Sequence, residues 1–187
     1  DLHYVPGGKG SNQAVAASRL SDHVYLIGKL GHDPFGNALT GFLKSENLNL
    51  DYLRYSDEHP SGVALITVND ASENTIVVVS GSNFQLAPDD VQSVMLTAQD
   101  MVSSVFEIPQ TTIRHLFSRA KDVGAQTILN PAPATTFIDG LLPLVDYLIV
   151  NETELAFFSG KPVDADDLAT VQHCIESVRA TPGQTVI

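Results

Sequence analysis

The sequence predicts an α/β fold with a doubly wound, mostly parallel sheet and a small β excursion from that sheet. After Pro88, short apolar runs alternate with helical stretches, which is typical of βαβ units and a parallel sheet. Before Pro88, two runs rich in β-branched residues, 61–68 and 75–79, flank the polar segment 69–74 and predict a hairpin outside that alternation. Hydrophobic residues make up 43% of the 187 and charged residues 17%, which is a normal globular balance.

The first half of the chain opens with small, helix-compatible residues. They predict a helix over 11–20, with Ser11 or Asn12 as its cap. A short apolar run predicts a strand over 23–28, and apolar spacing predicts a helix over 37–45. We expect residues 1–187 to form one partial α/β domain, with the hairpin at residues 61–79 outside its main sheet.

The second half contains the predicted βαβ units, and right-handed crossovers between them give a doubly wound domain. Cys174 lies in the apolar pattern of the last helix and is expected in the core, and Asp166 and Asp167 are expected in the solvated first turn of that helix. The predicted strands are 101–106, 126–129, 146–150 and 184–187, and the predicted helices are 111–123, 152–158 and 164–178.

The net charge of −12 argues against a nucleic-acid or anionic-membrane surface, because both partners require clustered Lys and Arg. An anionic small ligand remains possible, since backbone N–H groups, a metal ion and a few placed cations can hold one. Cys174 is the single cysteine, which favours a reducing, cytoplasmic setting. No apolar run reaches the ~18 residues of a membrane span.

A glycine-rich loop precedes the first predicted helix, with Gly7, Gly8 and Gly10 around Lys9 and followed by Asn12. Such a loop allows close approach of the backbone to a ligand, and the helix start favours a polar or anionic one. A P-loop is excluded because Gly10, not Ser or Thr, follows Lys9. On the residues alone, a tight turn before a helix explains the loop equally well.

Three further motifs follow predicted strands, where ligands gather in open α/β sheets. The segment 130–134 reads N-P-A-P-A, Asn151 and Glu154 open a helix, and Glu107 follows the strand 101–106. Taken alone, each also has a structural interpretation: a strand-ending turn, a capping box and a solvated loop acid.

The loop resembles the first signature of the ribokinase-like (PfkB) carbohydrate kinases. Segment 130–134 looks like the ribokinase branch of that family, and 151–154 is similar to the family's N-x-x-E motif. The likeness runs from Gly7 to Ile187. The residues that match the signature's spacing are Gly7, Gly8, Gly10, Asn12, Ala14, Ser21 and Gly31.

The resemblance implies roles for individual residues. Asn151 approaches the phosphates of ATP, and Glu154 organises Mg²⁺, through water. The hairpin, residues 61–79, becomes part of a small β lid that covers the sugar and mediates a homodimer. The residues implied to contact the sugar are Gly8, Lys9, Gly10, Asn12 and Glu107.

The implied activity is transfer of the γ-phosphoryl group of MgATP to the primary hydroxyl of a pentose, with D-ribose the expected substrate. The resemblance also implies that the catalytic Asp, the adenine pocket and a monovalent-cation (K⁺) loop lie beyond Ile187. It places the first strand, with its sugar-binding Asn and Asp, before Asp1. We therefore expect the 187-residue chain by itself to be inactive, and we assign it no catalytic residue.

Several alternatives stay open at this point. Another member of the family, such as a fructokinase, a deoxysugar kinase or a nucleoside kinase, would carry the same motifs. A non-catalytic sugar-binding pseudo-enzyme would as well. A dinucleotide-binding domain is disfavoured because no G-x-G-x-x-G follows a strand, and the scattered histidines have no metal-ligand spacing.

Overall fold

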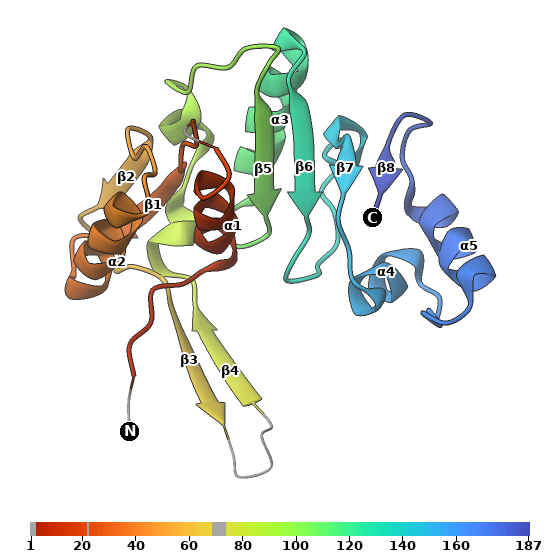
Figure 1. Ribbon diagram of the computed structural model, residues 1–187, viewed down its shortest axis with the longest axis horizontal. Coiled ribbons are helices and arrows are strands. Elements are labelled where there is room, and N and C mark those ends of the chain that lie inside the picture. Colours follow the sequence, from red (N-terminus) through yellow and green to blue (C-terminus); the bar gives the residue numbers. More distant parts are fainter. Residues whose placement is uncertain (1–2, 22, 69–73) are drawn as a thin grey trace. The chain divides into compact units, whose positions relative to one another are not determined.

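The computed structural model describes residues 3–21, 23–68 and 74–187, and it divides into two compact units, Asp1–Ser93 and Val94–Ile187 (Figure 1). That residues 1–187 form one domain remains a prediction.

Unit 1 contains two helices and a pair of parallel strands. Its helices are α1 (Lys9–Ser18) and α2 (Pro34–Ser45), and its strands β1 (Gly28–Gly31) and β2 (Leu53–Ser56) pair with Gly28 opposite Leu53. Val15, Leu43 and Leu48 form a buried cluster in this unit. Two short 3₁₀ helices, η1 (Gly81–Gln85) and η2 (Pro88–Val91), end the unit.

Three predictions for unit 1 need correction. Helix α2 begins at Pro34, not at residue 37, because Asp33 caps it by accepting a hydrogen bond from the Gly36 N–H. The first helix begins at Lys9, not at residue 11, and Gly8 rather than Ser11 or Asn12 occupies its N-cap position. The predicted strand 23–28 is wrong: Tyr25 makes only an isolated bridge to Asn49, and the regular strand begins at Gly28. That strand depends on its pairing with residues 53–56, a long-range contact that local apolar pattern does not report.

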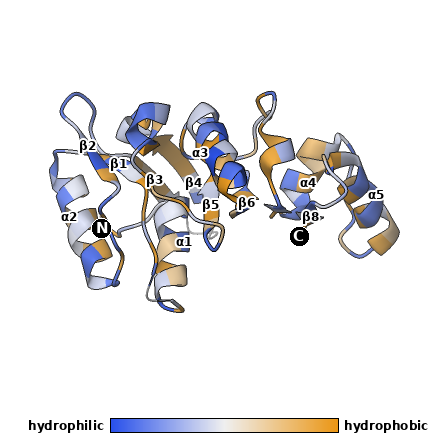
Figure 2. Ribbon diagram, turned by 90° about the horizontal axis from the view of Figure 1, so that it is seen from above, coloured by the Kyte–Doolittle hydropathy of each residue, from blue (hydrophilic) through white to orange (hydrophobic). Residues whose placement is uncertain are grey.

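The predicted hairpin is present. Strands β3 (Val63–Val68) and β4 (Asn74–Val79) pair antiparallel, with Val63 opposite Val79. The polar turn predicted between them lies, apart from Asn74, outside the described residues. Both faces carry exposed apolar side chains, and Figure 2 marks the two strands as largely hydrophobic. The exposed apolar residues of the pair include Leu65, Ile66, Val68, Ile76, Val77, Val78 and Val79.

Unit 2 contains a four-stranded parallel sheet in the order β5-β6-β7-β8. Helix α3 (Gln110–Val123) crosses between β5 and β6 and packs on both, as a βαβ unit requires. Phe117, Leu129 and Leu148 are fully buried in this unit, and so is Cys174, as predicted. The strands are β5 (Met101–Val105), β6 (Gln126–Asn130), β7 (Tyr147–Leu148) and β8 (Thr185–Val186), and the other helices are η3 (Leu142–Leu144), α4 (Glu152–Ser159) and α5 (Leu168–Val178).

The last helix begins later than predicted. α5 starts at Leu168 instead of residue 164, because Asp167 caps it by accepting a hydrogen bond from the Ala169 N–H at 3.0 Å. Asp167 is therefore the capping residue and not part of the first turn, and Asp166 precedes it. Helix α4 carries no such shift and begins at Glu152, as predicted.

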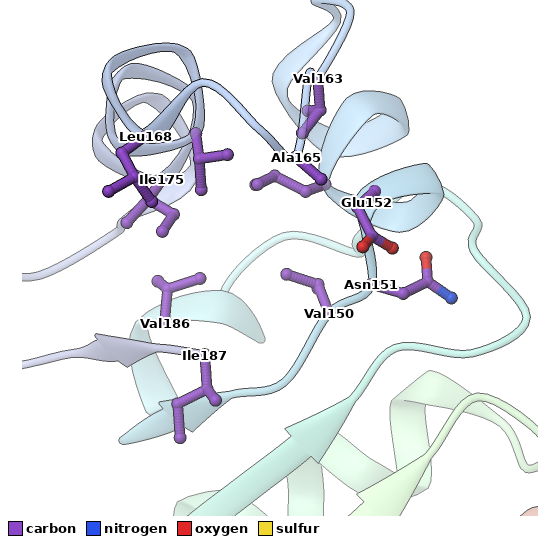
Figure 3. A pocket seen from close by; sticks show the side chains of 11 residues that line it. Val150, Asn151, Glu152, Val163, Ala165, Leu168, Ile175, Val186 and Ile187 are labelled. Carbon is purple, nitrogen blue, oxygen red and sulfur yellow. The ribbon is translucent and has the colours of Figure 1, made fainter.

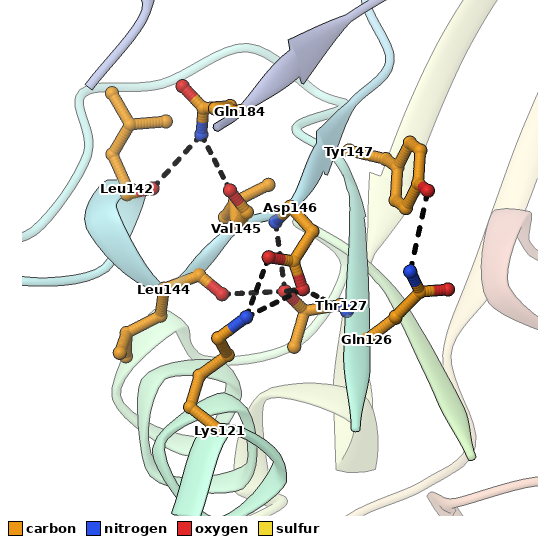
Figure 4. A network of polar contacts seen from close by, with 9 residues as sticks. All are labelled: Lys121, Gln126, Thr127, Leu142, Leu144, Val145, Asp146, Tyr147 and Gln184. Atoms are coloured by element: carbon orange, nitrogen blue, oxygen red, sulfur yellow. Dashed lines mark hydrogen bonds and ion pairs between the residues drawn. The ribbon is translucent and has the colours of Figure 1, made fainter. Parts of the chain in front are cut away.

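A polar network ties the amino ends of β6 and β7 to α3 (Figure 4). Lys121 Nζ lies 2.6 and 2.8 Å from the two carboxylate oxygens of Asp146, and the Thr127 N–H donates to the same carboxylate at 2.9 Å. Desolvation tends to raise the pKa of Asp146, but the hydrogen bonds from Lys121 and Thr127 outweigh it and hold that pKa below its ordinary value. Gln184, also drawn there, donates to the carbonyls of Leu142 and Val145.

A helix must be both long and apolar to cross a bilayer. None of the helices in the described part of the chain combines these two properties.

Candidate functional site

The glycine loop of unit 1 leads directly into α1. Gly8 has a φ of 101°, in a backbone region that residues with a side chain rarely enter. No side chain caps the helix start. Ser11 turns back instead, and its hydroxyl donates to the carbonyls of Gly7 and Gly8. The loop is thereby held closed on itself at the start of α1.

The polar side chains of this loop lie at the surface. Lys9 and Asn12 are exposed, and Gly10 between them is partly buried. The Asn12 N–H donates to the Gly8 carbonyl at 2.9 Å, so Gly8 and Asn12 are joined through the backbone. The loop brings Gly8, Lys9, Gly10 and Asn12 together in one turn of chain.

The carboxyl ends of the unit 2 strands are fastened to one another. The Phe106 N–H, just past β5, donates to the Ala132 carbonyl at 3.0 Å. Asn130 ends β6, and its side-chain amide donates to the Ile149 carbonyl past β7 at 3.0 Å. The N-P-A-P-A segment therefore joins the ends of β5, β6 and β7 into one rim.

Glu107 follows Phe106 on this rim and is partly buried. Aromatic rings pack beside this part of the chain: Phe106 lies 5.5 Å from Phe137, and Phe137 lies 4.6 Å from Phe158 of α4, between ring centroids. These rings come from three distant parts of the sequence. No spacing pattern predicts the cluster, and sequence reasoning missed it.

Asn151 and Glu154 sit where β7 leads into α4. The Asn151 side-chain oxygen accepts from the Glu154 N–H at 2.8 Å, and the Glu154 carboxylate accepts from the Asn151 N–H at 3.1 Å. This is a complete capping box. It engages one oxygen of each side chain, and within the described residues the Asn151 amide NH₂ and the second Glu154 oxygen have no partner.

A groove of about 430 Å³ opens beside this helix start, between α4, α5 and β8. Figure 3 shows that Asn151 and Glu152 bring the oxygen and nitrogen atoms among its labelled side chains, and the rest are apolar. Sequence reasoning singled out Asn151 but missed Glu152 and the apolar wall. The apolar residues include Val163, Leu168, Ile175, Val186 and Ile187.

The predicted site residues thus fall into two groups. Gly8, Lys9, Gly10 and Asn12 lie on one loop of unit 1, whereas Asn151 and Glu154 lie in direct contact in unit 2. Glu107 lies on the same rim as the second group, past β5. The described residues contain no group of three or more His, Cys, Asp or Glu side chains arranged to hold a metal ion by themselves.

Comparison with known proteins matches the whole chain, residues 1–187, to the model of the pfkB family carbohydrate kinases. The chain belongs to the PfkB carbohydrate kinase family. Its fold is the ribokinase-like α/β fold predicted above. A solved structure described as Arabidopsis thaliana ribokinase complexed with ribose and ATP superposes with a TM-score of 0.79, at 26% identity, over 96% of this chain and 58% of that one.

Two curated proteins are more similar to this chain in sequence than that structure is. A ribokinase of Staphylococcus aureus (strain COL) is 37% identical over 157 residues, which are 82% of this chain and 51% of the relative. A deoxyribokinase of Salmonella typhi is 36% identical over 164 residues, which are 86% of this chain and 54% of the relative. The chain therefore spans about half the length of these relatives.

Proposed function

We propose that the protein carrying this chain is an ATP-dependent sugar kinase that phosphorylates the primary hydroxyl of a pentose, with D-ribose as substrate and ribose 5-phosphate as product. The observation that carries the proposal is the match of all 187 residues to the family, together with a ribokinase that is 37% identical. The chemistry of the glycine loop and of the β7–α4 junction is consistent with it.

In this proposal the glycine loop contacts the sugar. Gly8 and Gly10 bring the backbone close to the ligand, and Lys9 and Asn12 offer donors and an acceptor to its hydroxyls. Support comes from the exposure of Lys9 and Asn12 at a helix start that lacks a side-chain cap. We propose Glu107 as a further sugar ligand, because a carboxylate accepts hydrogen bonds from hydroxyl groups.

We propose that Asn151 contacts the phosphates of ATP and that Glu154 holds Mg²⁺ through water. The capping box engages only one oxygen of Glu154, so the second remains for the ion's water shell. Mg²⁺ retains several waters and is commonly held by one or two carboxylates plus phosphate oxygens. When bound, the ion would neutralise charge on the phosphates.

The proposed reaction forms a bond between the sugar hydroxyl oxygen and the γ-phosphorus and breaks the bond from that phosphorus to the bridging oxygen of ADP. The hydroxyl proton leaves to a base, a role that we assign to none of the residues named above. The proposal includes stimulation by a monovalent cation, K⁺, to which we likewise assign none of them.

The hairpin serves as the lid of this site in our proposal. A lid limits hydrolysis of ATP by excluding water from the transferring phosphoryl group. Strands β3 and β4 expose apolar side chains on both faces, which suits contact with the sugar site on one face and with a second copy of the protein on the other. The proposed assembly is therefore a homodimer, and the proposed location is the cytoplasm.

A second candidate, a deoxyribose kinase, is favoured by the 36% identity to a deoxyribokinase. Rates measured with D-ribose, 2-deoxy-D-ribose, D-fructose and a nucleoside separate the candidates. We expect kcat/KM for ribose to exceed that for deoxyribose about a hundredfold or more, since a site that bonds the 2-hydroxyl penalises its absence. A preference for deoxyribose would support the second candidate, and no turnover of any of these acceptors would reject both.

A further inference from the structure

The hairpin joins unit 1 through a short root, residues 60–62 and 80–82. Beyond the root, β3 and β4 pair with each other and are exposed along nearly all of their described length. Side-chain packing along these strands therefore contributes little to the direction in which the hairpin points. That direction must be fixed mainly where the two strands leave the body of the unit.

Asp33 fastens the first arm of the root. One of its carboxylate oxygens accepts from the Gly36 N–H at 2.7 Å and caps α2. The other accepts from the Ser61 N–H at 2.6 Å. One carboxylate thus holds both the start of a helix and the start of the hairpin, two segments that are 28 residues apart in sequence.

Ser61 extends this connection to β1. Its hydroxyl accepts from the Gly31 N–H at 3.0 Å, and the residue is only 3% exposed. The packing leaves no room for larger residues, because a Cβ on Gly31 would lie 2.6 Å from the Ser61 nitrogen. Gly31, Asp33 and Ser61 therefore form a closed, tightly packed joint.

The second arm of the root is fastened by Ser82, which is fully buried. Its N–H donates to the Pro60 carbonyl at 2.8 Å, and its hydroxyl donates to the Lys29 carbonyl at 2.9 Å. The neighbouring Gly81 has a φ of 50°, and a Cβ there would lie 2.3 Å from the Pro60 oxygen. Both arms of the hairpin are thus bound to β1 and to each other.

We propose that Asp33 is a positioning residue that sets the angle of the hairpin by joining its root to the start of α2. The inference rests on the proposed function in one respect: if the hairpin is the lid of a sugar site, then Asp33 governs how well that lid closes on the sugar. Asp33 itself touches no substrate under this proposal. Its effect passes through Ser61.

The substitution Asp33→Ser separates capping from anchoring. Serine is as good an N-cap as aspartate, so its single oxygen still accepts from the Gly36 N–H, but it cannot also reach the Ser61 N–H. In the complete protein, we expect amide hydrogen exchange in residues 61–68 and 74–82 to become about tenfold faster, because a charge-assisted hydrogen bond is lost. Exchange in α2 should stay within about twofold of the wild type.

Kinetics supply the second readout. We expect Asp33→Ser to raise KM for the sugar about tenfold, with kcat and KM for ATP changed much less. The matched control is Asp167→Ser at the N-cap of α5, in unit 2, which should leave hairpin exchange and sugar KM unchanged. Ser61→Ala removes the hydroxyl that bonds Gly31 and Asp33 but keeps the Ser61 N–H bond to Asp33, so it should shift both readouts in the same direction by a smaller factor.

The two readouts keep the anchoring role separate from the proposed function. Unchanged hairpin exchange in both Asp33→Ser and Ser61→Ala would overturn the anchoring role. Faster exchange with an unchanged sugar KM would overturn the positioning role. If the wild-type protein phosphorylates no sugar, the proposed function fails, while faster hairpin exchange in Asp33→Ser still supports the anchor.

Discussion

Asn151 and Glu154 hold each other's backbone N–H groups at the start of α4, at 2.8 and 3.1 Å. This reciprocal cap satisfies two amides that a helix start otherwise leaves without partners. It also fixes the two side chains at the carboxyl end of β7, each with one polar group that the cap does not use. A structural role and a ligand-binding role are therefore compatible in the same pair.

The substitution Glu154→Gln tests the ligand role of this pair. Glutamine can still accept from the Asn151 N–H and complete the capping box, so the melting temperature should change little. Loss of the charge should lower activity at limiting Mg²⁺ about ten- to a hundredfold, as for other groups that orient a metal through water. A titration of the rate against Mg²⁺ measures this.

Glu152→Gln is the control for that experiment, because it removes a neighbouring charge outside the capping box. It should leave the Mg²⁺ dependence unchanged. An equal loss in both variants would show that net charge, not the position of Glu154, determines the effect.

The conformation of Gly8 makes a second prediction. The substitution Gly8→Ala places a side chain at a φ of 101°. It should cost about 1–3 kcal/mol of stability or displace the loop, and in either case it should raise KM for the sugar. Gly41→Ala in α2 is the matched control, since a Cβ there meets nothing within 4 Å. It should stabilise the helix by about 0.5–1 kcal/mol and leave KM unchanged. Thermal melts and sugar titrations of the two variants provide the comparison.

The Lys121–Asp146 pair predicts a pH dependence of stability. The pKa of Asp146 is lower in the folded protein than its ordinary value of 3.8, so the unfolded chain binds more protons at acid pH. The stabilisation that Asp146 provides is fully present above the ordinary pKa of 3.8 and is lost as the pH falls through the lower pKa of the folded state. Asp146→Asn should destabilise the protein by about 1–3 kcal/mol at pH 7 and flatten the acid limb of the curve. Denaturant unfolding across a pH series measures both effects.

Glu46→Gln serves as the comparison for that pair. Glu46 bonds Arg19, whose side chain is 64% exposed, and exposed ion pairs contribute little. Glu46→Gln should therefore destabilise the protein clearly less than Asp146→Asn does. Equal losses would show that the Thr127 and Lys121 hydrogen bonds to Asp146 contribute no more than an exposed ion pair.

Much of the fold could be predicted because local pattern and tertiary structure agree. The alternation after Pro88 indicated each strand and α-helix of unit 2 to within a few residues, though not the short η3, and the β-branched runs indicated the hairpin. The predictions failed where long-range contacts, and not the local sequence pattern, determine the secondary structure. β2 reads L-R-Y-S, a single short apolar–polar alternation that sequence reasoning did not assign, and it forms a strand by pairing with the glycine-bounded β1.

The residues of the candidate site divide in the same way, into those that a local motif indicates and those that only folding brings together. The motifs indicated Asn151 and Glu154 because both lie in one short segment after a strand. The joint of Asp33 with Ser61 was not predicted, since the two residues are 28 positions apart and the helix expected here began only at residue 37. The Phe106, Phe137 and Phe158 cluster was missed for the same reason: its members come together only through folding.

The central claim is phosphoryl transfer to a pentose, and the most direct test follows the phosphoryl group itself. The complete protein is incubated with MgATP labelled in the γ-phosphoryl group and with D-ribose, and the products are separated and identified. We predict labelled ribose 5-phosphate in an amount equal to the ADP formed. ADP formed without any labelled sugar phosphate, or no turnover with any of the sugars, would contradict the claim.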